Sequence, residues 1–368
     1  MTEWKTYRLG DIAKFQTGKL NSNAAVENGK YPFFTCSPNT LAINNYAFDK
    51  EAILLAGNNA EGNFSIKYYK GKFNAYQRTY IIETYNDICD IKFLFYALKL
   101  CLQQFKLMSQ GTSTKFLTAV ILNNFEISLP GLEEQRRIAG ILGAIDDKIE
   151  NNRRINANLE LQAQALYKQW FVDNRSEECA QIKLGDILEI SKQTISPSQF
   201  ADTTFEHYSL PAFDDGIQPV FEKGKDIKSS KFIVEQNMFL FSKLNPRIKR
   251  IWLPNIQTEN AICSTEFIPY KPKNEAMFGF CYSVVNSDSF YEYVLSLTNG
   301  STGSHQRFHP IDTLDYELTI PNNDYIAKFE KLIMPIYKII ARNRVECKNL
   351  ATLRDTLLPK LMNGEIKM

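Results

Sequence analysis

An internal repeat constrains this chain more than any other feature. The residues Leu-Gly-Asp-Ile at Leu9–Ile12 return at Leu184–Ile187, 175 positions later, and a basic residue precedes each copy. Two further matches lie at offsets of 189 and 191: Gln110–Ser113 with Asn299–Thr302, and Phe125–Pro130 with Tyr316–Pro321. Each repeat therefore runs from the four-residue motif through a glycine turn to a strand that ends in proline.

A long helical pattern follows each of these prolines. Its apolar positions step by three and four residues, as in a coiled-coil seam. In the second copy they are Phe329, Ile333, Ile336, Ile340, Cys347, Leu350, Leu357 and Leu361. The positions 191 residues earlier, in the first copy, are Ile138, Leu142, Ile145, Ile149, Asn156, Leu159, Leu166 and Trp170. At about forty residues, each helix spans roughly 60 Å. Two equal seams favour an antiparallel coiled coil with a pseudo-twofold axis; in the alternative, each helix packs on its own domain.

The seams share one polar position, occupied by Asn152 and Asn343 at the same offset of 191. A buried polar residue in a coiled coil often fixes the register of the helices. We therefore expect these two asparagines to help set the register of the pair.

The expected fold is α+β, with two similar domains of mixed helix and strand and two long helices. The predicted boundaries are a first domain at 1–131, a central helix at 132–175, a second domain at 176–322 and a C-terminal helix at 323–368. Strands are expected at Ala52–Ala56, Phe64–Tyr69, Thr79–Glu83, Met238–Phe241, Ile248–Leu253 and Ala261–Pro269. Helices are expected at Ile91–Phe105, Ala276–Val285 and Ser289–Leu297.

Composition narrows the class of protein. The net charge is only +2, which argues against a uniformly basic surface but leaves room for local basic patches. Seven cysteines without a CxxC pair, and only three histidines, make a disulfide framework or a zinc site improbable and fit a reducing cytoplasm. No signal-peptide core and no run of about eighteen apolar residues occurs, so a soluble, cytoplasmic protein without a membrane span is expected.

Two stretches combine basic and aromatic residues. Residues 64–80 hold four cations, six aromatic side chains and no acid, and residues 228–250 hold six cations with the single acid Glu235. Such surfaces suit phosphate contact and base-edge readout. The alternative is a solvated strand face.

The glycine turns point the same way. Gly111–Lys115 and Gly300–Arg307 each offer backbone donors, hydroxyl groups and a cation within one loop. These groups match phosphate oxygens, although one such loop alone is often only a turn.

No catalytic motif is recognisable. Gly57–Phe64 has the glycine spacing of a phosphate-binding loop but lacks its lysine and hydroxyl. Asn245–Arg247 lacks the second proline and the aromatic residue of the Asn/Asp-Pro-Pro-aromatic motif of an amino-methyltransferase. His305 and His309 are four residues apart, but glycine and proline bracket them and no third ligand is evident, so no metal is expected.

The chain resembles the specificity (S) subunit of Type I restriction-modification systems over essentially its full length. The central segment from Leu129 to Phe171 is similar to the conserved spacer helix of that family. Further similar segments are Gly71–Phe73, Gln77–Tyr80, Tyr208–Pro211, Phe241–Arg247, Ser264–Phe267 and Gly300–Arg307. The second spacer departs from the pattern at Asn322–Tyr325, which leaves the start of that helix open.

This resemblance implies two target-recognition domains, each reading one half of a bipartite, asymmetric site in double-stranded DNA. It implies that the helices act as a ruler and dock two methylation (M) subunits, which bring AdoMet and methylate adenine N6, and that restriction (R) subunits join to cleave. The S subunit itself has no active site and no cofactor. The residues we single out for DNA contact are Tyr76, Gln77, Arg78, Thr112, Ser113, Lys115, Lys243, Asn245, Arg247, Ser301, Ser304, His305, Gln306 and Arg307.

Two other classes stay open at this stage. A DNA-cutting or DNA-modifying enzyme would need an extra nuclease or methyltransferase region, for which two repeats leave no room. A scaffold whose domains bind proteins would lack salt-sensitive DNA binding. An aromatic cluster at Tyr167, Trp170 and Phe171 is either partner surface or the packing of the helix onto its domain.

Overall fold

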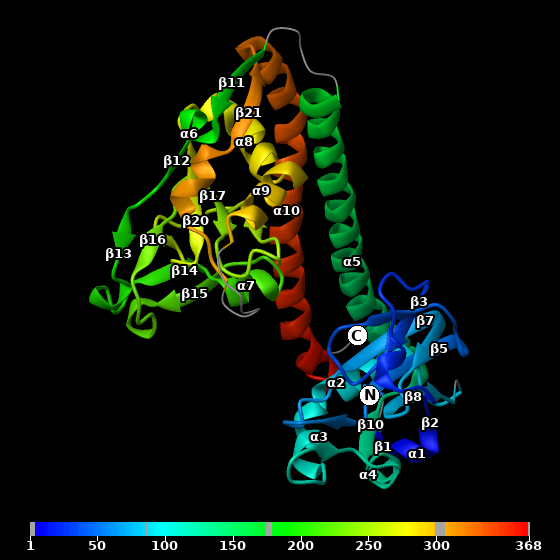
Figure 1. Cartoon of the computed structure of the whole chain (residues 1–368). Helices are drawn as coiled ribbons and strands as arrows, with labels where there is room; N and C mark the ends of the chain where they lie inside the picture. The colour runs from blue at the N-terminus through cyan, green and yellow to red at the C-terminus, as the bar shows by residue number, and fades with distance from the viewer. Residues whose placement is uncertain (1–3, 86, 174–178, 299–305, 367–368) are drawn as a thin grey trace. The chain divides into compact units, whose positions relative to one another are not determined.

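A computed structural model of the chain is drawn in Figure 1. The residues that it describes are 4–85, 87–173, 179–298 and 306–366. Sheets and helices occur together in both halves of the chain, so the expected α+β class is correct.

The chain divides into two compact units. Unit 1 comprises residues 1–147 and 351–368, and unit 2 comprises residues 148–350. The long helices α5 (Leu132–Lys168) and α10 (Asn323–Met362) each contribute residues to both units.

Unit 1 is built on a six-stranded sheet in the order β2-β8-β5-β7-β3-β4, with β3 and β7 parallel and the other neighbours antiparallel. Its strands are β2 (Ala13–Thr17), β3 (Tyr31–Phe34), β4 (Leu41–Ile43), β5 (Phe48–Ala56), β7 (Ile66–Ala75) and β8 (Thr79–Thr84). The last five residues of β5 are buried. Because successive side chains of a strand point to opposite faces, Ile53 and Leu55 join one core, whereas Leu54 packs with Phe34 in another.

Helices α2 (Ile91–Leu100) and α3 (Leu102–Met108) pack against the Ile53 side of this sheet. The carboxylate of Asp90 accepts a hydrogen bond from Phe93 N at 3.0 Å and caps α2. The sequence predicts one helical stretch here, which is confirmed except for a break at Cys101.

The repeat is visible as equivalent hydrogen bonds. In each unit the Leu-Gly-Asp-Ile motif forms a one-turn helix directly after the first strand of a two-stranded antiparallel sheet. These elements are β1 (Lys5–Arg8), α1 (Leu9–Ile12) and β10 (Glu126–Leu129) in unit 1, and β11 (Cys179–Lys183), α6 (Leu184–Ile187) and β21 (Glu317–Pro321) in unit 2. Leu9 N donates to Phe125 O at 2.8 Å, and Leu184 N donates to Tyr316 O at 2.8 Å. The repeated motifs therefore occupy the same structural position.

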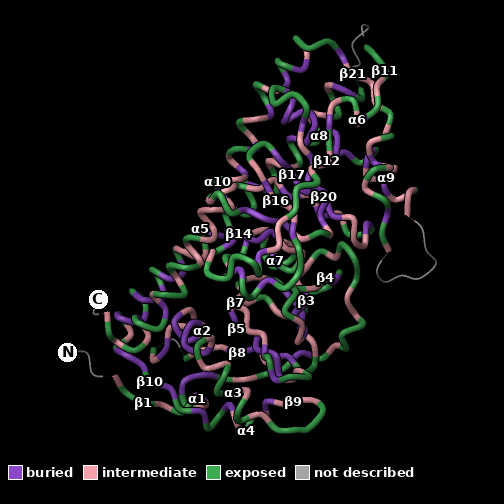
Figure 2. The backbone as a smooth tube through the Cα atoms, turned by 90° about the vertical axis from the view of Figure 1, so that its left-hand side faces the viewer, coloured by how far each residue is buried: buried purple, intermediate pink, exposed green. Residues whose placement is uncertain are grey.

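Besides the β11-β21 pair, the described part of unit 2 has two larger sheets, in the orders β12-β20-β17-β18 and β13-β16-β19-β14-β15. Their strands are β12 (Leu188–Ile190), β13 (Thr194–Ile195), β14 (Thr204–Tyr208), β15 (Val220–Lys223), β16 (Lys231–Ile233), β17 (Phe239–Ser242), β18 (Ile251–Trp252), β19 (Ala261–Cys263) and β20 (Phe267–Pro272). The helices are α7 (Leu210–Asp214), α8 (Phe278–Val285) and α9 (Asp288–Ser296). Every residue of α8 is buried, and Figure 2 shows buried positions following α8 and the neighbouring β17.

Three strand predictions need correction. The predicted strand Ala261–Pro269 is two strands, because a turn closed by Phe267 N donating to Ser264 O separates β19 from β20. Only Ile251–Trp252 of the predicted strand Ile248–Leu253 is extended and paired, because the preceding residues form a turn. In unit 1, β7 begins two residues later and runs six residues further than expected.

In unit 1, the two long helices share a core. Ile138 and Leu142 of α5 are buried in the same cluster as Leu358 and Leu361 of α10. The apolar residues of the predicted seam therefore face the partner helix, as a coiled coil requires.

In unit 2, residues later in α5 and the turn that follows it contact residues earlier in α10. Cys347 Sγ lies 3.6 Å from Ile149 O, Asn343 Nδ2 donates to Asn156 Oδ1 at 2.9 Å, and the rings of Phe171 and Phe329 lie 4.8 Å apart. The antiparallel pairing predicted from the sequence is confirmed.

The polar residues of this seam differ in detail from the expectation. Asn152 and Asn343 are both buried, but Asn152 donates a hydrogen bond to Glu346 and Asn343 donates one to Asn156. Helix α5 ends at Lys168 and continues into a π-turn over Gln169–Asp173. Within the described ranges, no helix is long and apolar enough to cross a membrane.

Candidate nucleic-acid interface

A tight turn between β7 and β8 carries the first predicted contact residues. Thr79 N donates to Tyr76 O at 2.9 Å, which closes the turn and leaves Gln77 and Arg78 exposed at its tip. The Gln77 amide donates to Asn21 Oδ1 at 2.8 Å, and Tyr76 is half-buried.

The glycine loop of unit 1 reaches the same edge. Strand β9 (Lys115–Phe116) pairs with β6 (Asn58–Asn59), and Phe116 exchanges two backbone hydrogen bonds with Gln110. Gly111 has a φ of 108°, a backbone conformation that favours glycine. The loop that it starts exposes Thr112 and Ser113.

A contact between side chains joins the turn to the loop. The guanidinium carbon of Arg78 lies 5.2 Å from the centre of the Phe116 ring, and Gly57 N donates to Arg78 O at 2.8 Å. A cation at this distance from an aromatic face is attracted to it. Residues from both sequence motifs, Arg78 and Lys115, thus belong to one edge of the domain.

The second domain builds a comparable edge from its own predicted residues. Lys243 N donates to Glu266 O at 2.9 Å, and Asn245 N donates to Gln306 O at 2.9 Å. Asn245 has a φ of 47°, and Arg247 is exposed in the turn that follows it.

Arg307 is held by Glu266. Its Nε donates to Glu266 Oε2 at 3.1 Å and its Nη2 donates to Oε1 at 2.9 Å, which makes a two-point ion pair. The predicted contact residues Ser301, Ser304 and His305 lie outside the described residues.

The basic stretches do not form continuous cationic surfaces. In residues 228–250, Arg250 makes two hydrogen bonds to Asp214, Lys249 donates to Asn286 O, and Lys231 is buried against Ser229. Burial lowers the pKa of Lys231 and of Lys249. These cations make contacts within the domain. The number of basic residues in the sequence therefore overstates the number of cations available for contact with DNA.

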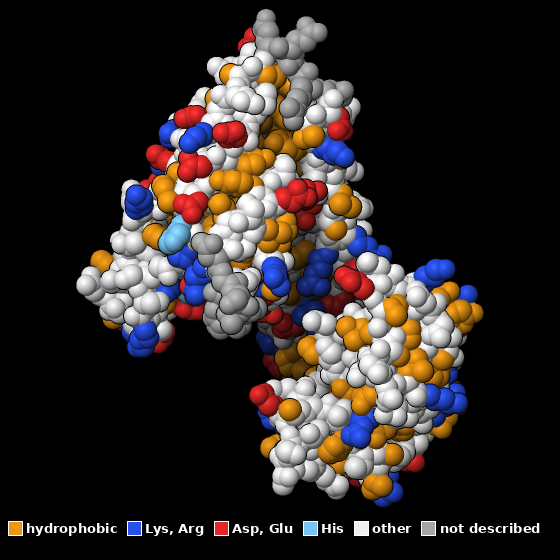
Figure 3. All heavy atoms as spheres, in the orientation of Figure 1, with side chains coloured by type: hydrophobic (Ala, Val, Ile, Leu, Met, Phe, Trp, Pro, Cys, Tyr) orange, Lys and Arg blue, Asp and Glu red, His pale blue; other side chains and the backbone are white. Residues whose placement is uncertain are grey.

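Charge on the visible face agrees with this conclusion. In Figure 3, Lys and Arg side chains are interspersed with Asp and Glu. In the first stretch, Lys67 donates to Ser37 O at 3.0 Å and Lys70 pairs with Glu51 at 3.2 Å. Any DNA contact must therefore come from local groups such as the two edges, not from a uniform basic field.

Sequence reasoning missed four residues of these edges. They are not among the predicted contact residues and join the edges through strand pairing and side-chain contact: Asn58, Asn59, Phe116 and Glu266. The offset of 191 offered a signal, because it places Phe116 opposite Arg307 in the repeat.

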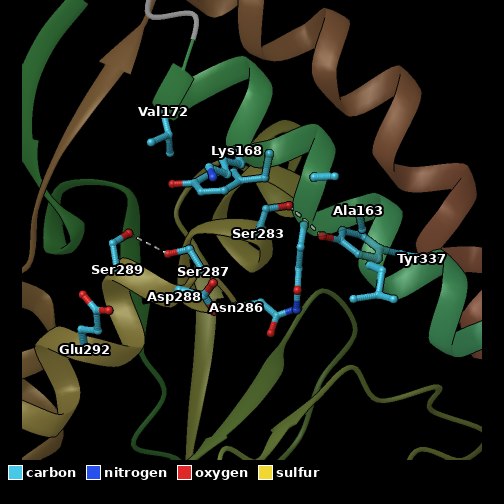
Figure 4. Close-up of a pocket in the computed structure, with 14 residues that line it drawn as sticks. Ala163, Lys168, Val172, Ser283, Asn286, Ser287, Asp288, Ser289, Glu292 and Tyr337 are labelled. Carbon is cyan, nitrogen blue, oxygen red and sulfur yellow. Dashed lines mark hydrogen bonds between the residues drawn. The ribbon is translucent and has the colours of Figure 1, made fainter.

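One cavity of unit 2 lies beside the long helices. It measures about 470 Å³ and lies in unit 2 among α5, the α8–α9 connection and α10 (Figure 4). Ser283 donates to Gly279 O and contacts the Tyr337 hydroxyl, and Ser287 donates to Val284 O. No predicted contact residue that the structure describes lines it, and the described part of the chain holds no cluster of three His, Cys, Asp or Glu suited to a metal.

The aromatic cluster at the end of α5 packs onto its own unit. Phe171 is buried, with its ring 4.8 Å from Phe280 and 4.8 Å from Phe329, and Trp170 lies 4.8 Å from Tyr325. Of the two interpretations left open, packing accounts for these side chains.

Comparison with known proteins finds one family of similar proteins. A family model described as "Type I restriction modification DNA specificity domain" matches residues 1–161. The chain is 29% identical over 327 residues to the Type I restriction enzyme EcoDI specificity subunit of Escherichia coli, an alignment that covers 77% of this chain and 71% of that protein. In sequence the chain is thus similar to the specificity subunits of Type I restriction-modification systems.

Other specificity subunits extend the match to the whole chain. The HindI specificity subunit of Haemophilus influenzae is 24% identical over 466 aligned positions that span 100% of both chains. A crystal structure of the S subunit from M. genitalium covers 98% of this chain and 96% of its own, with a TM-score of 0.69 at 16% identity. The resemblance stated from the sequence is confirmed, and the solved structure shows that the fold is shared.

Proposed function

We infer that this chain is the DNA-recognition subunit of a Type I restriction-modification complex, in which each domain reads one half of a bipartite, asymmetric site. One observation carries this proposal. The two domains build the same edge from equivalent backbone hydrogen bonds but equip it with different side chains, Arg78 and Phe116 in one and Glu266 and Arg307 in the other. A shared backbone arrangement that presents different side chains is suited to recognising two half-sites of different sequence.

The groups on these edges suit the two tasks of DNA recognition. Exposed Arg247 and the Gly111 loop offer a cation, hydroxyls and backbone N–H groups for phosphate oxygens. Gln77, Arg78 and Asn245 can donate to base edges, since Arg matches guanine and Gln or Asn matches adenine in the major groove.

The long helices suit the task of a spacer. Helix α5 has 37 residues, which corresponds to about 55 Å. The buried amide pair of Asn156 and Asn343 disfavours slippage, because a shift of one residue would leave both amides without their partner. A spacer of fixed register would give the DNA site a gap of fixed length.

Exposed apolar side chains on the helices support docking of partner subunits. Leu161 is 65% exposed, Leu353 48% and Leu332 47%. In the complex that we infer, two M subunits cover such positions, bind AdoMet and methylate adenine N6, and R subunits add cleavage. This chain supplies target choice, and the chemistry takes place in its partners.

Co-expression with the M subunit encoded beside it tests the proposal. N6-methyladenine is then mapped across the host genome by single-molecule sequencing. A single bipartite motif with a degenerate gap of fixed length is the expected result. A stable complex with M that methylates no defined motif would overturn the assignment, as would DNA cleavage or methyl transfer by the purified chain alone with Mg²⁺ and AdoMet.

A further inference from the structure

Backbone hydrogen bonds align one turn residue in each domain. Gly57 N donates to Arg78 O in unit 1, and Lys243 N donates to Glu266 O in unit 2. Each acceptor is the third residue of a turn that the following residue closes by donating to the first, at Tyr76 in unit 1 and Ser264 in unit 2. Arg78 and Glu266 therefore occupy equivalent positions.

The strand after the glycine loop aligns in the same way. Lys115 is paired with Asn59, and Asn245 N donates to Gln306 O. The next residue is Phe116 in unit 1 and Arg307 in unit 2. Phe116 and Arg307 are thus a second pair of equivalent positions.

The same two positions touch in both domains, but with different chemistry. In unit 1 the turn supplies the arginine and the strand supplies an aromatic ring, with 5.2 Å between guanidinium carbon and ring centre. In unit 2 the strand supplies the arginine and the turn supplies a carboxylate, with two hydrogen bonds of 3.1 and 2.9 Å.

We propose that these equivalent contacts are the specificity-determining pairs of the two domains, with Phe116 and Glu266 as positioning residues that set how each arginine meets a base. The proposal rests on the function inferred above. It assigns a role in recognition to Phe116 and Glu266, which are not among the contact residues predicted from the sequence.

The two partners leave each arginine with different donors. The Phe116 ring, unlike a carboxylate, has no oxygen to accept hydrogen bonds from Arg78. The guanidinium fork of Arg78 can therefore match O6 and N7 of guanine. Glu266 engages Nε and Nη2 of Arg307, so the fork facing the carboxylate is not available to a base. This two-point contact also sets the plane in which the Arg307 guanidinium lies.

The two pairs also differ in charge. Arg78 with Phe116 carries one positive charge, whereas Arg307 with Glu266 is neutral overall and brings a carboxylate toward the DNA phosphates. Removing water from the carboxylate costs free energy, and only the contact with the correct base offsets that cost. Glu266 would therefore disfavour binding to other sequences. Removing that carboxylate should therefore strengthen indiscriminate binding while weakening discrimination.

The test uses Glu266→Gln in the full complex with the M subunit. Binding is measured against a duplex that contains the motif found with the unchanged chain and a duplex of equal length with that motif scrambled. The ratio of the two affinities should fall roughly ten-fold, and the salt dependence of scrambled-duplex binding should steepen by about one phosphate contact. The methylated motif should lose a defined base in one half-site only.

A matched control removes the same charge elsewhere in the domain. Glu235 pairs with Lys271 at 2.9 Å, so Glu235→Gln makes an equal charge change without touching the proposed pair.

In unit 1, Phe116→Leu should weaken the preference for one base of the other half-site and leave the salt dependence of binding unchanged. Tyr46→Leu, which removes the ring beneath Lys72 at 4.8 Å, is its matched control.

A second variant keeps the proposal falsifiable if Glu266→Gln does not assemble. Arg307→Lys keeps the charge but cannot form the fork, and it should relax the same base. An unchanged motif and affinity ratio in Arg307→Lys or in an assembled Glu266→Gln complex would overturn the pair while leaving the proposed function intact. If the unchanged complex itself methylates no motif, the proposed function fails and the pair fails with it.

Discussion

Asn343 donates a hydrogen bond from Nδ2 to Oδ1 of Asn156 at 2.9 Å in the buried seam between α10 and α5. Asn156 in turn donates to Ile340 O at 3.1 Å, while Cys347 lies 3.6 Å from Ile149 O at the position related by the repeat offset. The reciprocal contacts are those expected of two equivalent helices that pair antiparallel.

Replacing Asn343 alone should destabilise the protein. In Asn343→Leu, the Asn156 side chain stays buried without its amide partner, and the free energy of unfolding should fall by about 1–3 kcal/mol. Urea denaturation followed by circular dichroism measures the loss. The double variant Asn156→Leu/Asn343→Leu should recover part of it, because two apolar groups leave no amide stranded; equal stability of the single variant and the unchanged chain would contradict this role.

Phe329 should be among the most sensitive core positions of unit 2. It is fully buried and packs against Phe171. Phe329→Ala removes a large side chain from a closed site, so the free energy of unfolding should fall by about 3–5 kcal/mol. Leu161→Ala on the same helix pair is the control, because Leu161 is 65% exposed and its loss should change stability by less than about 0.5 kcal/mol. Equal effects of the two substitutions would disprove the assignment of Phe329 to the core.

Salt dependence should reveal the cations that meet DNA. Arg78→Ala and Arg247→Ala should each weaken binding of the complex to DNA and reduce the slope of log affinity against log salt by about one. Lys271→Ala should leave that slope unchanged, because its ammonium is paired with Glu235. Titrations at several salt concentrations measure the slope, and an unaltered slope in both arginine variants would remove them from the interface.

Glu330 should make stability depend on pH in a specific direction. Burial raises the pKa of this carboxyl, although Gly279 N and Phe280 N donate to it and partly offset the rise. The folded state therefore binds the proton more tightly than the unfolded state. The resulting stabilisation is present at acidic pH and is lost as the pH rises from the ordinary value of 4.5 through the raised pKa.

Comparison with Glu330→Gln isolates this group. Between pH 7 and pH 5 the unchanged chain should gain stability relative to Glu330→Gln, because only the unchanged chain takes up this proton. Urea midpoints of both proteins at each pH measure the difference. A stability difference that is the same at both pH values would show that the Glu330 carboxyl does not titrate with a raised pKa.

Much of the fold follows from patterns that are local in the sequence. The heptad steps identify the faces of α5 and α10 that become buried, as Ile138 and Phe329 show. The Leu-Gly-Asp-Ile motif marks two equivalent one-turn helices. The apolar run Ala261–Pro269 predicts a single strand, because residue type alone does not reveal the turn at Ser264 that divides it.

The candidate site could be predicted only in part. The turn at Gln77–Arg78 and the loop before Lys115 were found from residue types alone, and the structure joins them at one edge. Arg250, in contrast, lies in a basic stretch but is committed to Asp214. Residue type shows that a cation is present, but not whether another part of the chain already neutralises it.

The sequence by itself determined the repeat, the long seams and the family, because these are carried by residue spacing and composition along the chain. The tertiary structure alone decided the partners: Glu266 for Arg307, Phe116 for Arg78 and Asn156 for Asn343. The physical reason is that such contacts depend on strand register and helix stagger between segments tens to hundreds of residues apart. Those alignments are set by how all of the apolar faces pack together, which no single stretch of sequence specifies.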